Sequence, residues 1–251
     1  MSKNSYDGFF IGWGKKLPKS LPSFLIVISL FVVGLFAGTA FSFVVTQDDP
    51  GDGAFRFDMG RQKLVGVITA DPYPVLHVAA SDDYPDGRSI MLSGSGKRGV
   101  MDQASQLDGK VAEVRGVLLK RGELEMIQVR GRMKPMLDIT PHQVKTSSLG
   151  KWQLSGEICD GKCYAGAMRP GNGLAHKACA NLCLVGGVPA VFVSKGEVEG
   201  ASFFMLADSE GNVVDNNLYD ITAVLLTAQG EVERLGALNV FKIDLSAVTL
   251  Q

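Results

Sequence analysis

Several motifs that would assign a function are missing from this sequence of 251 residues. It has no GxxxxGK[ST] phosphate loop, no HExxH motif of zinc proteases and no recognisable Ser-His-Asp arrangement. It also lacks CxxC and CxxCH, the motifs of thioredoxin-like redox sites and of covalent haem attachment. No catalytic residue can therefore be assigned, and we expect a function other than catalysis.

The chain also lacks an excess of charge of either sign. It has 25 lysines and arginines against 26 aspartates and glutamates, a formal net charge of −1. Neither a basic tract nor an interleaving of basic and aromatic residues is present, so we expect no nucleic-acid partner. A twin-arginine signal and a lipobox cysteine are absent too, and we expect neither export by that route nor lipidation.

Charged residues are absent from one long stretch, Phe24 to Val45, whose 22 residues match the length that crosses a bilayer. Three lysines lie close before it and three aspartates close after it: Lys15, Lys16, Lys19, Asp48, Asp49 and Asp52. Because lysines stay cytoplasmic, we predict a single-pass helix over 24–45, a cytoplasmic leader over 1–23 and an exported C-terminal part. The alternative is a cleaved signal peptide ending near Ala40, but the stretch is longer than the about 7–15 apolar residues of such peptides.

Two features near this helix point to partners besides the membrane. Gly34 and Gly38 form a GxxxG spacing, which lets two helices approach closely and could support self-association. The aromatic leader segment Tyr6–Trp13 is expected at the cytoplasmic interface, where it could contact another membrane protein.

Long helical periods are missing from the rest of the chain, which has the pattern of β-structure. Residues 46–61 are polar and predict a linker. Short runs of β-forming residues follow, separated by Gly, Asp and Pro: Leu64–Thr69, Ile90–Leu92, Val111–Leu119 and Glu125–Val129. Only Asp102–Leu107 favours a helix in this region. We therefore expect a mainly β protein.

The C-terminal half repeats this pattern, which predicts two tandem modules over 62–140 and 150–251. Four pairs of segments correspond in the same order: 64–71 with 154–160, 89–100 with 203–214, 116–125 with 224–233, and 126–129 with 238–240. The alternative is that unrelated hairpins share Gly-Glu turns. The succession of strands resembles the OB-fold, a small five-stranded Greek-key barrel, so we expect two OB-like barrels.

The second copy is longer between its first two strands. Gly66 and Met91 lie 25 residues apart, whereas Gly156 and Met205 lie 49 apart. The second module therefore carries an insertion, placed within 159–200. A loop of this kind on a rigid barrel is where chemistry is usually found.

All the cysteines of the chain lie in this insertion: Cys159, Cys163, Cys179 and Cys183. The segment 175–185 predicts a helix that ends at Gly186-Gly187. At about 100° per residue, His176, Cys179 and Cys183 share one face of that helix. Cys159 and Cys163 flank the turn after the preceding strand, so a cluster of sulfurs with one imidazole is expected.

Three interpretations of the cluster stay open. Zinc or copper could bind to Cys163, His176, Cys179 and Cys183, with Cys159 and Met168 as further candidates. In an oxidising compartment the four cysteines could instead form two disulfides that cross-link turn and helix. A thiol of lowered pKa near the helix start could also serve redox chemistry or metal transfer.

The remaining polar residues have simpler interpretations. His77 and His142 have no cysteines nearby in the sequence and are expected at the surface or in turns. Asp160 follows the first strand of its copy, as Asp71 does in the other, and both are interpreted as turn residues. Glu157 is expected on the exposed side of its strand or in an ion pair with Lys162.

The run Gly156-Glu-Ile-x-Asp-x-Lys-Cys-Tyr-x-Gly-x-Met-x-Pro-Gly-x-Gly-x-x-His-x-x-Cys-Ala-x-x-Cys183 resembles a family of uncharacterised bacterial single-pass membrane proteins, as does the leader Asp7–Trp13. The resemblance implies an inner-membrane protein with its C-terminal domains in the periplasm and an accessory or assembly role near an electron-transfer complex. Cys159 is less typical of the run, which favours three cysteines with His176 over two disulfides. The alternative function is a thiol-redox or metal-transfer protein acting through the four cysteines.

Overall fold

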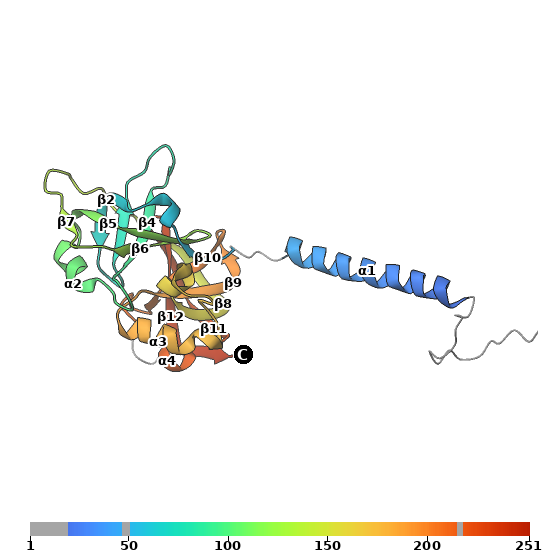
Figure 1. Ribbon diagram of the computed structural model, residues 1–251. Helices are drawn as coiled ribbons and strands as arrows, with labels where there is room; N and C mark the ends of the chain where they lie inside the picture. Colours follow the sequence, from blue (N-terminus) through green and yellow to red (C-terminus); the bar gives the residue numbers. More distant parts are fainter. Residues whose placement is uncertain (1–19, 47–50, 215–217) are drawn as a thin grey trace, which may run out of the picture. The chain divides into compact units, whose positions relative to one another are not determined.

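The computed structural model describes residues 20–46, 51–214 and 218–251, and the chain divides into two parts after Asp49. The described residues of the first part form the helix α1 (Leu21–Thr46), which contains no charged residue. Figure 1 shows it as one continuous helix. Its stretch Leu21–Val45 is long and apolar enough to cross a membrane. The expected helix is thus present, and residues 1–19 of the predicted leader lie outside the described residues.

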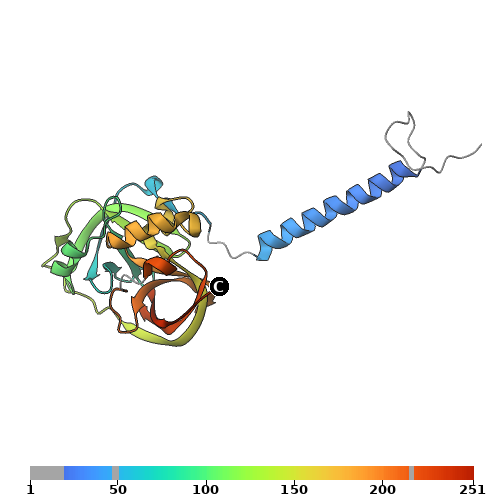
Figure 2. The same ribbon diagram turned by 90° about the horizontal axis from the view of Figure 1, so that it is seen from below.

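The C-terminal half forms a closed barrel of five strands: β8 (Thr146–Asp160), β9 (Ala190–Val198), β10 (Ala201–Asp208), β11 (Leu226–Leu235) and β12 (Leu238–Leu250). Around the barrel the order is β8-β9-β10-β12-β11, and β11 pairs again with β8. The β10–β12 pair is parallel and the other four pairs are antiparallel. Figure 2 shows this ring of yellow-green to red strands almost end-on.

The preceding half forms a second sheet whose five main strands are β2 (Gln62–Thr69), β3 (Val75–Val78), β4 (Arg88–Ser93), β5 (Val111–Arg121) and β6 (Leu124–Val129). They pair in the same order as the barrel strands, since β5 contacts both β2 and β6, and β4 runs parallel to β6. Two short strands, β1 (Ala54–Phe55) and β7 (Lys134–Pro135), add to β5. The prediction of a mainly β protein is confirmed.

Among the described residues outside the cysteine-bearing region there are also four short helical turns: η1 (Phe57–Met59), α2 (Met101–Ala104), η2 (Ser105–Leu107) and α4 (Leu218–Ile221). Together α2 and η2 cover the stretch around Asp102–Leu107 for which a helix is expected. Within the segment expected to be a linker, β1 and η1 are already ordered elements, so the folded part begins before residue 62.

The strand registers show how the two halves correspond. Met91 on β4 corresponds to Met205 on β10, as the repeat predicts, and each pairs in parallel with the last strand of its copy. Met91 pairs with Met126 and Met205 with Val240, so the fourth predicted correspondence, which begins at Met126 and Leu238, is two residues out of register. Gly116 on β5 corresponds to Gly230 on β11, however, and not to Val224, so the third predicted correspondence is six residues out of register. At both glycines a β-carbon would collide with the backbone of the neighbouring strand, which explains why the two copies share glycine there.

The insertion is confirmed between the first two strands of the second copy. Val67 on β2 pairs with His77 on β3, ten residues later. Glu157 on β8 pairs with Val193 on β9, 36 residues later. The additional residues follow the end of β8 at Asp160 and include three of the four cysteines.

One hydrophobic cluster joins the two halves. The barrel contributes its largest buried rings, Phe192, Phe204 and Phe241, and the first sheet contributes Tyr73, Val75, Met91, Leu119, Leu124 and Met126. A separate cluster belongs to the first sheet alone. Because the joint cluster buries side chains from both halves, the first sheet and the barrel form one packed body that supports the insertion from both sides.

Candidate metal centre

The insertion folds into two helical segments. A π-helical turn, η3 (Cys163–Ala167), leads through a loop to a 3₁₀ turn, η4 (Leu174–His176), and then to the α-helix α3 (Lys177–Val185). The helix ends at the predicted glycines, where Gly186 N–H donates to a carbonyl of the last turn. The expected helix over 175–185 is therefore present, with its first turn in the tighter 3₁₀ form.

Gly166 determines the path of η3. Its φ is +126°, and a β-carbon there would collide with the backbone of Gly53 and Ala54. Only glycine meets both requirements. The chain just before and in β1 therefore lies directly against the turn that carries Cys163.

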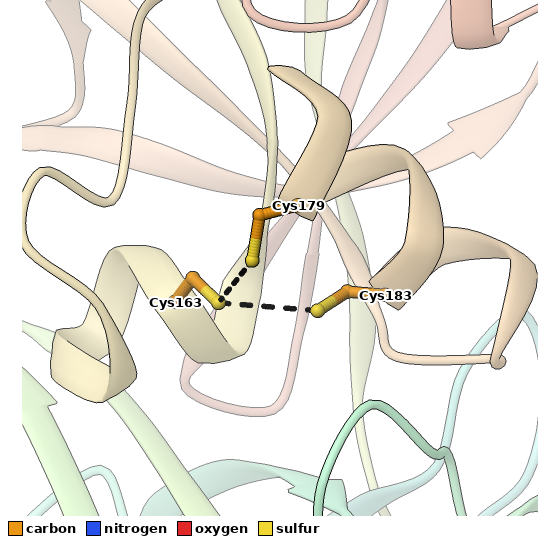
Figure 3. Close-up of side chains that lie close together, drawn as sticks. All are labelled: Cys163, Cys179 and Cys183. Carbon is orange, nitrogen blue, oxygen red and sulfur yellow. Dashed lines mark hydrogen bonds between the residues drawn. The ribbon is translucent and has the colours of Figure 1, made fainter. Parts of the chain in front are cut away.

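Three cysteines converge where η3 faces α3. Cys163 Sγ lies 4.0 Å from Cys179 Sγ and 3.9 Å from Cys183 Sγ, and all three sulfurs lie within 4.8 Å of one another. Their side chains point toward a common centre (Figure 3). Two thiolates that bind one zinc ion tetrahedrally are about 3.8 Å apart, given Zn–S bonds of about 2.3 Å. The three sulfurs could therefore hold a metal ion.

A second group of candidate ligands shares Cys163. His176 Nε2 lies 2.9 Å from Oδ2 of Asp160, and both side chains are buried. Because an ionised carboxylate only accepts hydrogen bonds, Nε2 carries the proton in this pair. Nδ1 of His176 is buried and has no hydrogen-bond partner among the described residues. In the neutral imidazole this nitrogen offers a lone pair to a metal.

The four predicted ligands thus do not form one compact group. Cys163, Cys179 and Cys183 form one, and Asp160, Cys163 and His176 form the other. His176 lies in the 3₁₀ turn before α3, so the α-helical spacing that placed it beside the cysteines does not apply. Asp160, interpreted from the sequence as a turn residue, is instead the buried partner of His176.

Cys159 and Met168 lie outside both groups. Cys159 is fully buried on β8 in the hydrophobic cluster that joins the two halves, and burial raises the pKa of its thiol well above the ordinary value. Met168 is 46% exposed. All four cysteines are free thiols, and a pair of disulfides would have to recruit Cys159 from the core.

A lysine adds positive charge beside the thiols. Lys97 Nζ lies 2.6 Å from Cys179 Sγ and 3.7 Å from Cys183 Sγ, and the first contact raises the pKa of Lys97. The hydrogen bond between the thiols of Cys163 and Cys183 lowers the pKa of Cys183 and raises that of Cys163. The cluster therefore favours a thiolate at Cys183, which is the form that binds metals.

Lys97 belongs to a glycine-rich loop of the first sheet, residues 94–99 between β4 and α2, that sequence reasoning missed. Its backbone binds the insertion: Lys162 Nζ donates to the carbonyls of Gly94 and Gly96 at 2.6 and 2.7 Å. Lys162 therefore does not form the expected ion pair with Glu157, which accepts from a backbone N–H instead. The three glycines of Gly94-Ser-Gly-Lys-Arg-Gly99 were the available signal, since such spacing marks a close backbone approach.

The expectation that His77 lies at the surface is wrong. It is 2% exposed on β3, with Nε2 2.9 Å from Thr69 Oγ1 and Nδ1 2.8 Å from Ser89 Oγ. Burial lowers its pKa to about 4. His142 is exposed, as expected. Both histidines line a cleft of about 620 Å³ that no cysteine lines, so the cleft is distinct from the thiol cluster.

No protein-family model matches this chain, and neither does any curated protein or solved structure. The geometry of the cysteine-bearing insertion therefore carries the functional argument.

Proposed function

We propose that this protein is a membrane-anchored metal-binding protein that holds one soft metal ion between η3 and α3. The convergence of the sulfurs of Cys163, Cys179 and Cys183 carries the proposal. Thiolates so close together repel one another, and a shared cation removes that repulsion. Such a site gives the insertion a bond across its two helical segments, which have few apolar contacts of their own.

Zinc and copper fit this set of ligands best. Both bind thiolate sulfur well, whereas magnesium and calcium prefer oxygen ligands. Cys163 and Cys183 are buried and Cys179 is half-buried. A bound ion would therefore be largely shielded from water and would be reached from the side of Cys179.

His176 completes the site in this proposal: its imidazole, which now groups with Asp160 and Cys163 only, would shift toward Cys179 and Cys183 and bind the ion through Nδ1. Asp160 holds the opposite ring nitrogen, as carboxylates commonly do for metal-binding histidines. Four protein ligands would close the site, as in structural zinc sites, whereas three would leave one position for exchange.

The location and the fold that we propose rest on the apolar helix α1 and on the strand order. We place α1 across a bacterial inner membrane, with the leader cytoplasmic and the remainder periplasmic. We assign both five-stranded rings to the OB-fold. In each ring the third and fifth strands form a parallel pair, and the fourth strand closes the ring by pairing with the first. The resemblance described above and the aromatic leader support an accessory or assembly role beside a membrane electron-transfer complex, with self-association through Gly34 and Gly38.

A thiol-redox protein is the second candidate. Cys163 lies within 4.0 Å of two other sulfurs, so it could form a disulfide with either after a shift of about 2 Å. The lowered pKa of Cys183, which its hydrogen bond with Cys163 causes, would favour the reactive thiolate. This candidate predicts a cysteine pair that is oxidised and reduced reversibly, and no retained metal.

Metal content of the purified full-length protein, compared with single cysteine variants, tests the proposal. We expect one zinc or copper ion per chain, lost in Cys163→Ser and retained in Cys159→Ser, which changes a cysteine outside the cluster. Equal metal content in both variants would refute the assigned ligands. A metal-free protein with a reversible Cys163 disulfide would support the redox function instead.

A further inference from the structure

We infer that Lys97 is a positioning residue that slows release of the metal ion, a role that rests on the metal-binding function proposed above. Lys97 is not part of the insertion. It comes from the first sheet, 82 residues before Cys179 in the sequence, and reaches the cluster through the glycine-rich loop 94–99.

The lysine covers the accessible side of the site. Its Nζ contacts Cys179 Sγ at 2.6 Å, Cys183 Sγ at 3.7 Å and the Cys179 carbonyl at 3.4 Å. Cys179 is the most exposed of the three clustered thiols, and Lys97 itself faces solvent. A competing chelator that approaches from solvent therefore meets the ammonium group before it meets Cys179.

The loop that carries Lys97 is held in place by the insertion itself. Lys162 donates to two of its carbonyls, and Gly99 N–H donates to Gly186 O. A β-carbon at Gly186 would collide with the Lys97 carbonyl, so the two backbones touch. Because the loop backbone is already fixed, little conformational entropy is lost when the ammonium group binds the cluster.

Charge explains why an ammonium group would retain the metal. A divalent ion with three thiolates and a neutral imidazole carries a net charge of −1, which Lys97 offsets. A charge-assisted hydrogen bond from Lys97 Nζ to Cys179 Sγ also holds that sulfur in place as a ligand. Metal loss begins when one ligand is displaced, and Lys97 opposes displacement of Cys179, the most exposed of the three thiol ligands.

The rate of zinc transfer from the zinc-loaded full-length protein to the chromogenic chelator 4-(2-pyridylazo)resorcinol at neutral pH tests this role. We expect Lys97→Met to release zinc about tenfold faster or more, the range of other outer-sphere substitutions at metal sites. Lys97→Arg should release zinc at a rate close to that of the wild-type protein. Arg98→Met is the matched control, since it removes the same charge from the neighbouring exposed position of the loop.

Circular dichroism and the thermal midpoint of each metal-free variant separate this role from simple support of the loop. Faster release in Lys97→Met with unchanged folding, and rescue by arginine, would support the inference. Equal release rates in Lys97→Met and Arg98→Met would overturn it while leaving the metal site intact. An original protein that binds no zinc would overturn both the inference and the function on which it rests.

Discussion

One buried carboxylate orients two of the candidate ligands: Asp160 accepts a hydrogen bond from His176 Nε2 at 2.9 Å and another from the backbone N–H of Cys163 at 2.8 Å. The histidine and the cysteine come from different segments of the insertion, and Asp160 ends the strand on which the insertion begins. The rigid barrel thus sets the positions of both through a single side chain.

Replacing Asp160 with asparagine should weaken metal binding about 10–100-fold, because the amide can no longer fix the ring of His176 as a charged acceptor does. Competition with a chelator of known affinity measures the change. Asp71→Asn is the matched control, since Asp71 also follows the first strand of its copy but is exposed. Equal affinities in the two variants would mean that Asp160 does not support the ligands.

The four thiols of the metal-free protein should react with iodoacetamide in a defined order. Cys179 is the most exposed and lies beside Lys97, so it should react first. Cys159 is fully buried with a raised pKa and should react only after unfolding. A time course followed by peptide mass spectrometry gives the order. Early labelling of Cys159 would show that it is not held in the core.

Gly186→Ala should destabilise the protein by about 2 kcal/mol or more, because the added methyl group collides with the carbonyl of Lys97 and separates the two backbones. Urea unfolding measures the loss. Gly196→Ala provides the comparison, since nothing lies within 4 Å of its β-carbon, and its effect should stay within about 0.5 kcal/mol. Similar midpoints for both variants would contradict the contact between loop and insertion.

Stability should fall as the pH is lowered from about 6.5 toward 4, in part because of His77. Burial lowers the pKa of His77 from 6.5 to about 4, so in this window the unfolded chain binds a proton that the folded chain does not. This group alone contributes up to about 3 kcal/mol. Urea unfolding of His77→Gln across the window should show a flatter dependence, whereas exposed His142→Gln should keep most of the slope. An unchanged slope in His77→Gln would assign the effect to other groups.

Local sequence patterns were sufficient to predict where several strands lie and where the insertion is placed. Leu64–Thr69 and Glu125–Val129 lie within β2 and β6, because short runs of β-forming residues with Gly, Asp or Pro nearby favour strands. Cys179 and Cys183 lie one helical turn apart, so their side chains can both face Cys163. The third repeat correspondence failed because Gly122-Glu123, in a hairpin turn, and Gly230-Glu231, within β11, look alike in sequence.

The parts of the site that were missed depend on contacts between distant segments. Nothing local to Lys97 indicates that it reaches Cys179, because the approach requires the first sheet and the barrel to pack together. His176 faces Asp160 because the chain enters α3 through a 3₁₀ turn, which rotates by about 20° more per residue than an α-helix, and the sequence does not specify this change. Asp160 follows a strand as many turn residues do, and only burial distinguishes it.

X-ray absorption at the metal edge of the purified full-length protein tests the central claim most directly. With zinc bound, we predict a first shell of three sulfurs at about 2.3 Å and one nitrogen at about 2.0–2.1 Å, and loss of one sulfur in Cys163→Ser. A shell of nitrogen and oxygen alone, or a protein that carries no metal while its cysteines are joined in disulfides, would contradict the assignment of Cys163, Cys179, Cys183 and His176 as a metal centre.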